Sequence, residues 1–286
     1  MKETVKDYKD LFCVSGMTEL EKALYGGDPY AERVGRMHYC TKTVKAGAAL
    51  NVRIYPILGR SDEIKAETIR RGMSAEKQKR HNDAKAQRRM RLLLEANFGA
   101  ADQHVTLTYA GEPPTYSRAV KDVENYISRI KRMRKRRGLP ELKYLWVLEE
   151  EGVDGQKRKT HCHMVMSGGL SREELESKWG KGFANADRLQ PDELEGLNAL
   201  AKYLCKTERV KYQRKWSCSK NLKKPEPTIS RTKLSNRRVR RICSALPGEA
   251  AEVLQQVYTG YRLAECKVWL SEWIGGVYVD VWMRRG

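Results

Sequence analysis

The stretch that decides the fold is His161-Cys162-His163-Met164-Val165-Met166-Ser167-Gly168-Gly169, a strand-like run that stops at a glycine pair. Side chains on a strand alternate between the two faces of its sheet. His161 and His163 are therefore expected to point one way, and Cys162 and Met164 the other. Two imidazoles held side by side can both bind one metal ion. The stretch predicts a sheet strand that carries a candidate metal site.

The segment before this strand supplies a candidate carboxylate ligand. Lys143 to Glu149 (KYLWVLE) predicts a second strand, with apolar residues on both faces, and the polar residues from Gly152 to Thr160 predict a hairpin connection. Antiparallel pairing brings the end of one strand beside the start of the next. Glu149 is therefore expected to complete a His, His, carboxylate set, with Glu151 as the backup ligand. Such a set leaves coordination positions open for substrate oxygens.

A candidate nucleophile follows in Tyr203-Leu204-Cys205-Lys206, on a predicted helix with Pro191 at its first position. Helical positions i and i+3 share a face, so Lys206 is expected beside Tyr203. A tyrosine hydroxyl, with a pKa of about 10, needs a nearby cation or a metal-polarised phosphate to become a good nucleophile. The alternative for Tyr203 is a core tyrosine on an amphipathic helix, and the histidines favour the catalytic interpretation.

The charge balance indicates a polyanionic partner. Lys and Arg number 56 against 36 acidic residues, which gives a formal net charge of +20. Such an excess suits nucleic acid held through its phosphates. Cations cluster on two predicted helices, the first from Asp62 to Phe98 and the second from Ser117 to Arg137; an exposed helix without a partner is the alternative for the first. The expected DNA contacts are Arg88 and Arg89 on the first, and Lys131, Arg132, Arg134, Lys135, Arg136 and Arg137 on the second.

Several classes of protein are excluded by motifs that the chain lacks. It has no apolar run of about 18 residues and no apolar secretory signal at its start, so we expect a cytoplasmic protein without a membrane partner. Its seven cysteines form no C-x-x-C pair, which argues against a zinc ribbon or a disulfide framework. No G-x-x-x-x-G-K-[ST] occurs, so no nucleotide cofactor and no fused helicase are expected.

The order of predicted elements around the histidines indicates the fold class. Strand, helix, strand, strand, helix, strand and helix follow one another, which predicts an α+β fold with a central antiparallel sheet and helices packed on one side. Ser171-Arg172-Glu173-Glu174 predicts a capping box at the second helix. The predicted organisation is an N-terminal extension (1–99) with a basic helix, a core (100–226), and a C-terminal segment (227–286) for packing or partner binding.

Three ordered motifs resemble those of HUH endonucleases of the rolling-circle replication initiator (Rep) type. The family's hydrophobic-Thr-Leu-Thr strand matches Val105-Thr106-Leu107-Thr108, its His-hydrophobic-His motif matches His161-Cys162-His163, and its Tyr-hydrophobic-x-Lys motif matches Tyr203-Leu204-Cys205-Lys206. The resemblance covers about residues 100 to 226. Cys162 replaces the bulky apolar residue usual between the histidines, and Ala199 occupies the place of a further tyrosine, so the chain resembles the single-tyrosine members.

The resemblance implies a ferredoxin- or RRM-like palm that nicks and joins single-stranded or hairpin origin DNA of a phage or plasmid. Mg²⁺ or Mn²⁺ would be held by His161, His163 and Glu149, and Tyr203 would form a 5′-phosphotyrosyl link with Lys206 stabilising charge on the phosphate. The free 3′-OH would prime a host polymerase, and a host helicase would unwind the duplex.

Two alternatives stay open. A relaxase or a single-tyrosine transposase has the same chemistry on other DNA ends. A non-catalytic nucleic-acid-binding protein would use the H-x-H only structurally.

Overall fold

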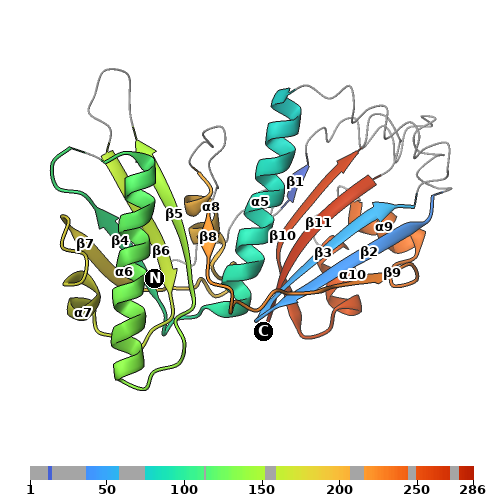
Figure 1. Ribbon diagram of the computed structural model, residues 1–286. Coiled ribbons are helices and arrows are strands. Elements are labelled where there is room, and N and C mark those ends of the chain that lie inside the picture. The colour runs from blue at the N-terminus through green and yellow to red at the C-terminus, as the bar shows by residue number, and fades with distance from the viewer. Residues whose placement is uncertain are drawn as a thin grey trace, which may run out of the picture. The chain divides into compact units, whose positions relative to one another are not determined.

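The computed structural model describes residues 12–14, 37–57, 75–112, 114–151, 159–206, 216–243, 249–270 and 277–286. The chain divides into two compact units. The histidine unit contains Ala86–Asp192 and Leu197–Lys224, and the second unit contains Met1–Lys85, Glu193–Gly196 and Pro225–Gly286. Each unit holds one β-sheet (Figure 1). The α+β class is as predicted, with two sheets in place of one.

The sheet of the histidine unit is antiparallel, with strand order β7-β4-β6-β5-β8. The predicted order of elements is confirmed, because β4, α6, β5, β6, α7, β7 and α8 follow one another along the chain. The strand that carries both histidines lies at the centre of the sheet, between β4 and β5. The strands are β4 (Gln103–Thr108), β5 (Tyr144–Glu151), β6 (Lys159–Met166), β7 (Ala184–Arg188) and β8 (Ser217–Cys218).

Helices cover both faces of this sheet, which corrects the prediction of helices on one side. Helices α6 (Tyr116–Arg136) and α7 (Arg172–Glu176) pack on the face that carries Cys162 and Met164. Helices α5 (Ala75–Asn97) and α8 (Asn198–Leu204) pack on the other face, against Val147 and Val165. The physical reason is that β5 is apolar on both faces, and each apolar face must be buried.

Some predicted helix ends were wrong. Helix α6 is capped by Thr115 instead of Ser117, and α8 begins at Asn198, well after Pro191. Because α8 ends at Leu204, Lys206 lies beyond the helix. The predicted capping box is confirmed, since Glu174 N–H donates to Ser171 Oγ and Ser171 N–H donates to Glu174 Oε2. The predicted interruption near Gly72 falls outside the described residues.

The second unit contains strands from both ends of the chain. Its sheet has the order β1-β10-β11-β3-β2-β9 and is antiparallel except between β1 and β10. Residues of the predicted N-terminal extension and C-terminal segment thus share one sheet, because β11 pairs with β3. Trp282 is buried, and Trp269 stacks on Tyr278. The elements are β1 (Phe12–Val14), β2 (Tyr39–Ala46), β3 (Ala49–Pro56), β9 (Pro227–Ser230), α9 (Asn236–Cys243), α10 (Glu249–Val257), β10 (Tyr261–Leu270) and β11 (Val277–Arg285).

No helix within the described ranges is long and apolar enough to cross a membrane.

Candidate active site

Two threonines of β4 orient the two histidines of β6. The strand register pairs Thr106 with His163 and Thr108 with His161. The Thr106 hydroxyl lies 3.3 Å from Nδ1 of His163, and the Thr108 hydroxyl lies 3.1 Å from Nδ1 of His161. A hydroxyl that accepts a proton from Nδ1–H leaves the lone pair of the ring at Nε2, where a metal ion can bind. The Thr-Leu-Thr motif can therefore fix both the rotation and the tautomer of the imidazoles.

The alternation predicted for the H-x-H strand is present. The rings of His161 and His163 lie on one face with their centroids 6.4 Å apart. Cys162 is fully buried among apolar side chains on the opposite face. Burial raises the pKa of its thiol, so this residue packs as a hydrophobe.

Glu149 lies against the histidines. Its backbone pairs with His161 across β5 and β6, and its Oε2 lies 3.3 Å from Nε2 of His163. Both side chains are nearly inaccessible to solvent, with Glu149 9% and His163 6% exposed. The side chain of Glu151, the predicted backup ligand, lies outside the described residues. The carboxylate that the hairpin argument selected is thus within contact distance of the site.

Tyr203 reaches the same site from α8. Its hydroxyl lies 3.1 Å from Nε2 of His163, and the two ring centroids are 4.9 Å apart. The side chain is 45% exposed, which is high for a tyrosine that contacts a buried histidine. Leu204 and Ala201, on the same short helix, are buried against the sheet and hold it there. The phenol is therefore both anchored beside the histidines and accessible to a substrate.

Lys206 does not share the helical face of Tyr203. Its backbone N–H donates to the carbonyl of Tyr203 at 3.1 Å, in the turn that follows α8, and its side chain is exposed. Its proximity to the phenol therefore depends on the turn and not on helical spacing.

His104 belongs to the site although the motifs did not select it. Its ring stacks on His163 with centroids 5.6 Å apart and an interplanar angle of 19°, and it meets the edge of Tyr203. Burial, with the nearby His163 as a second cause, lowers the pKa of His104 to about 4. His104 is thus a neutral ring at pH 7. Its position two residues before Thr106, on the same strand face, is a signal that the sequence offered.

The donor set fits a divalent cation in its chemistry, because two imidazoles and a carboxylate project from one face of adjacent strands. In the parts of the chain that the structure describes, no three His, Cys, Asp or Glu side chains are gathered closely enough to hold a metal ion. The distances give the reason: Glu149 and Tyr203 both contact Nε2 of His163. A metal ion could bind there only if Nε2 exchanged these contacts for it.

The predicted DNA-contacting cations are not gathered at this site. Arg134 is 4% exposed, and its guanidinium donates to the carbonyls of Pro140, Ser167 and Gly168, so its role is structural and the prediction of a DNA contact is corrected. Arg137 is paired with Glu174.

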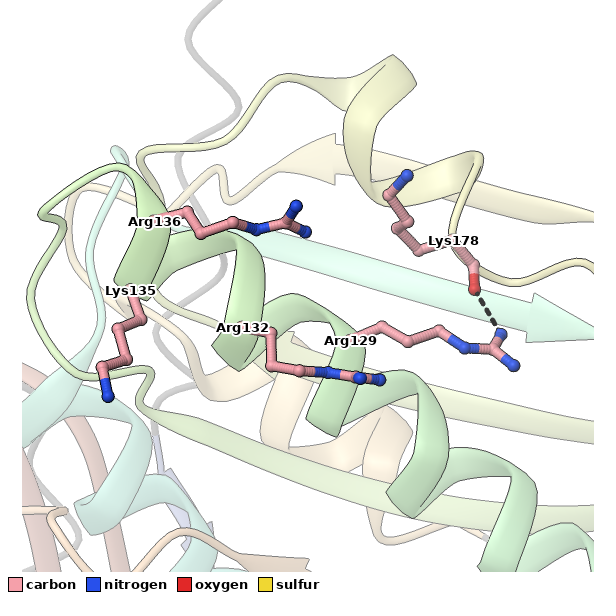
Figure 2. Close-up of a pocket in the computed structure, with 5 residues that line it drawn as sticks. All are labelled: Arg129, Arg132, Lys135, Arg136 and Lys178. Carbon is pink, nitrogen blue, oxygen red and sulfur yellow. Dashed lines mark hydrogen bonds between the residues drawn. The ribbon is translucent and has the colours of Figure 1, made fainter.

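The other cations named in the sequence occupy three places. Lys131 lies over the ring of Tyr144 at 5.3 Å, and Arg88 and Arg89 lie on α5, of which Arg89 is the more exposed. Arg132, Lys135 and Arg136 line a groove on the outer side of α6 (Figure 2).

Comparison with known proteins agrees with the three motifs. Residues 102–208 match the family model of the replication-associated protein ORF2, and this span contains the Thr-Leu-Thr strand, the H-x-H strand and Tyr203. The match covers less than half of the chain. No curated protein and no solved structure matches the chain. The family match supports a role in replication.

Proposed function

We propose that this protein initiates DNA replication by nicking and joining single-stranded DNA, with Tyr203 as the nucleophile. The observation that carries the proposal is the 3.1 Å contact between the Tyr203 hydroxyl and Nε2 of His163. A phenol from one motif and an imidazole from another meet there, although 40 residues separate them in the chain. Such a juxtaposition of nucleophile and metal-binding donors is what phosphoryl transfer by a tyrosine needs.

In the proposed reaction the Tyr203 oxygen attacks the phosphorus of the scissile phosphodiester, and the bond from phosphorus to the 3′ oxygen breaks. The products are a 5′-phosphotyrosyl link and a free 3′-OH, so the phenol loses one proton and the leaving oxygen gains one. The 45% exposure of Tyr203 gives the strand access to the phenol. Reversal by another 3′-OH would rejoin the strand and release the tyrosine.

The remaining residues hold and orient. Glu149, His161 and His163 would hold Mg²⁺ or Mn²⁺, which when bound supplies Lewis-acid polarisation of the phosphate. Thr106 and Thr108 fix the imidazoles through Nδ1. His104 packs as a neutral ring against His163. Lys206 would lower the energy of the negative charge that develops on the phosphate oxygens.

The contact between Tyr203 and His163 has a consequence for the order of events. The hydroxyl cannot contact Nε2 of His163 and attack a phosphate through the same direction of approach. This contact therefore corresponds to a resting arrangement, which the substrate strand and the metal ion would replace. Tyr203 lies one residue before the end of α8, where a small movement of the last turn would displace its side chain.

The test is covalent adduct formation with a labelled single-stranded oligonucleotide and Mn²⁺, followed on a denaturing gel. Wild-type protein is expected to give a shifted band, and Tyr203→Phe to give none while binding the oligonucleotide normally. Tyr109→Phe is the matched control, because its hydroxyl donates to Asp122 and lies outside the site. An adduct that persists in Tyr203→Phe would assign the nucleophile to another residue. Wild-type protein that forms no adduct would favour the non-catalytic nucleic-acid-binding alternative.

The family match favours replication over conjugative transfer or transposition. Cleavage of a hairpin-bearing origin fragment, compared with transfer-origin and transposon-end fragments, separates these functions. In replication the released 3′-OH would be extended by a host polymerase, with a separate host helicase opening the duplex.

A further inference from the structure

A groove on the outer side of α6 is lined by positively charged side chains alone. The lining residues are Arg129, Arg132, Lys135, Arg136 and Lys178. Four come from α6, and Lys178 comes from the turn after α7 (Figure 2). A concave surface with cations on two of its sides suits a chain of negative charges better than a flat cationic surface does.

Helical spacing brings three of these cations into one row. Arg129, Arg132 and Arg136 occupy positions i, i+3 and i+7, which share one face of a helix and span about 10 Å along its axis. Figure 2 shows the three guanidinium groups extending from α6 on the same side, toward the segment that carries Lys178, whereas Lys135 points away from them. The Arg129 guanidinium donates to the carbonyls of Lys178 at 2.9 Å and Trp179 at 3.4 Å. One end of the row is therefore fixed in position.

The nearest acidic side chains on α7 are engaged with other cations. Glu174 accepts from Arg137, and Glu176 accepts from Arg172 at 2.7 Å. These ion pairs balance their own charges and leave the row on α6 uncompensated by the lining residues. The groove thus keeps a net positive charge, which costs electrostatic energy in the free protein and is relieved when an anion binds.

The groove lies apart from the candidate active site within the same unit. The inner side of α6, with Val123, Ile127 and Ile130, packs on the sheet face that carries Cys162. His161 and His163 project from the opposite face. A ligand in the groove therefore cannot contact Tyr203 or the metal-binding donors, and it would contribute binding energy without taking part in the chemistry.

We propose that this groove binds the phosphate backbone of a base-paired segment of the DNA substrate, at a distance from the phosphate that is cleaved. Duplex DNA is favoured over a single strand because the lining contains no aromatic side chain on which an unpaired base could stack. A duplex presents only its sugar-phosphate backbone to such a surface. The choice of DNA as the polyanion rests on the proposed function.

The test compares Arg132→Gln/Arg136→Gln with Lys223→Gln/Lys224→Gln, a control that removes the same charge from exposed residues outside the groove. Binding is measured by fluorescence anisotropy from 50 to 200 mM salt, on an oligonucleotide with a base-paired stem and on its single-stranded part alone. The groove variant is expected to reduce the salt slope for the stem-bearing oligonucleotide by about 2, so that its affinity falls roughly tenfold less over this range. The control variant and the single-stranded oligonucleotide are expected to show no such change.

A wild-type slope in the groove variant would overturn the proposal, and so would an equal change on both oligonucleotides. The adduct assay at saturating DNA separates this inference from the proposed function. The groove variant is expected to form the adduct at the wild-type rate. If wild-type protein formed no adduct while the stem-dependent slope persisted, the nicking function would fail and the duplex-binding groove would stand.

Discussion

Replacing the threonines behind the histidines tests whether the sheet prepares the imidazoles for a metal ion. Thr106→Val and Thr108→Val keep the size and the β-branched shape that suit a strand, and they remove only the hydroxyl. Each hydroxyl contacts Nδ1 of one histidine, at 3.3 Å for Thr106 and 3.1 Å for Thr108. Loss of this contact frees the ring to rotate and to place its proton on either nitrogen.

The expected magnitude follows from the role of such outer contacts. Removing the hydrogen-bond partner of a metal-binding histidine typically weakens metal affinity by about 10-fold to 100-fold, or roughly 1.4 to 2.7 kcal/mol. Thr108→Val should approach the larger value, because its contact is the shorter one. The double variant should lose more than either single variant, since each threonine serves a different ring.

The assay is the Mn²⁺ concentration that gives half-maximal adduct formation, together with calorimetry of Mn²⁺ binding to the DNA-free protein. Thr106→Ser and Thr108→Ser keep the hydroxyl and should stay close to wild type. If Thr108→Val required no more Mn²⁺ than wild type in both measurements, the threonines would not orient metal ligands and the reasoning would be refuted.

The other predictions concern packing and accessibility. Cys162→Ser should lower the free energy of unfolding by about 1–3 kcal/mol in urea titration, because it places a hydroxyl in an apolar core; an unchanged unfolding midpoint would contradict this. Gly182→Ala should destabilise more than Gly180→Ala, since a Cβ at Gly182 would lie 2.4 Å from the Thr108 carbonyl oxygen, whereas a Cβ at Gly180 meets no atom within 4 Å; equal unfolding midpoints would contradict it. Iodoacetamide should modify exposed Cys218 in the native protein and spare Cys162 until it unfolds, as mass spectrometry can establish.

The sequence was sufficient for features that depend on local geometry. Alternation along one strand assigned His161 and His163 to one face and Cys162 to the other. A short hairpin connection was enough to set Glu149 opposite His161, because antiparallel strands joined this way pair in register. The order of strands and helices followed from patterns that each span only a few residues.

Other features could not be predicted because they depend on contacts between distant segments. A count of charges indicated that Arg134 binds DNA, and only the fold revealed the backbone carbonyls that its guanidinium meets. The two flanks of the chain gave no sign that β3 and β11 pair. His104 carried no motif, and its importance came from stacking on a ring of the neighbouring strand.

What the sequence determined by itself is the chemistry available to this protein: two imidazoles on one face, a carboxylate beside them, a tyrosine on a later helix and a large positive charge. What only the tertiary structure decided is that the Tyr203 hydroxyl contacts His163, and that the cationic row of α6 lies on the opposite face of the sheet. The reason is that α8 and α6 are positioned by the burial of Leu204 and Ile130 against different faces of one sheet. Residue spacing constrains a single element, whereas the choice of face depends on apolar surface contributed by the whole unit.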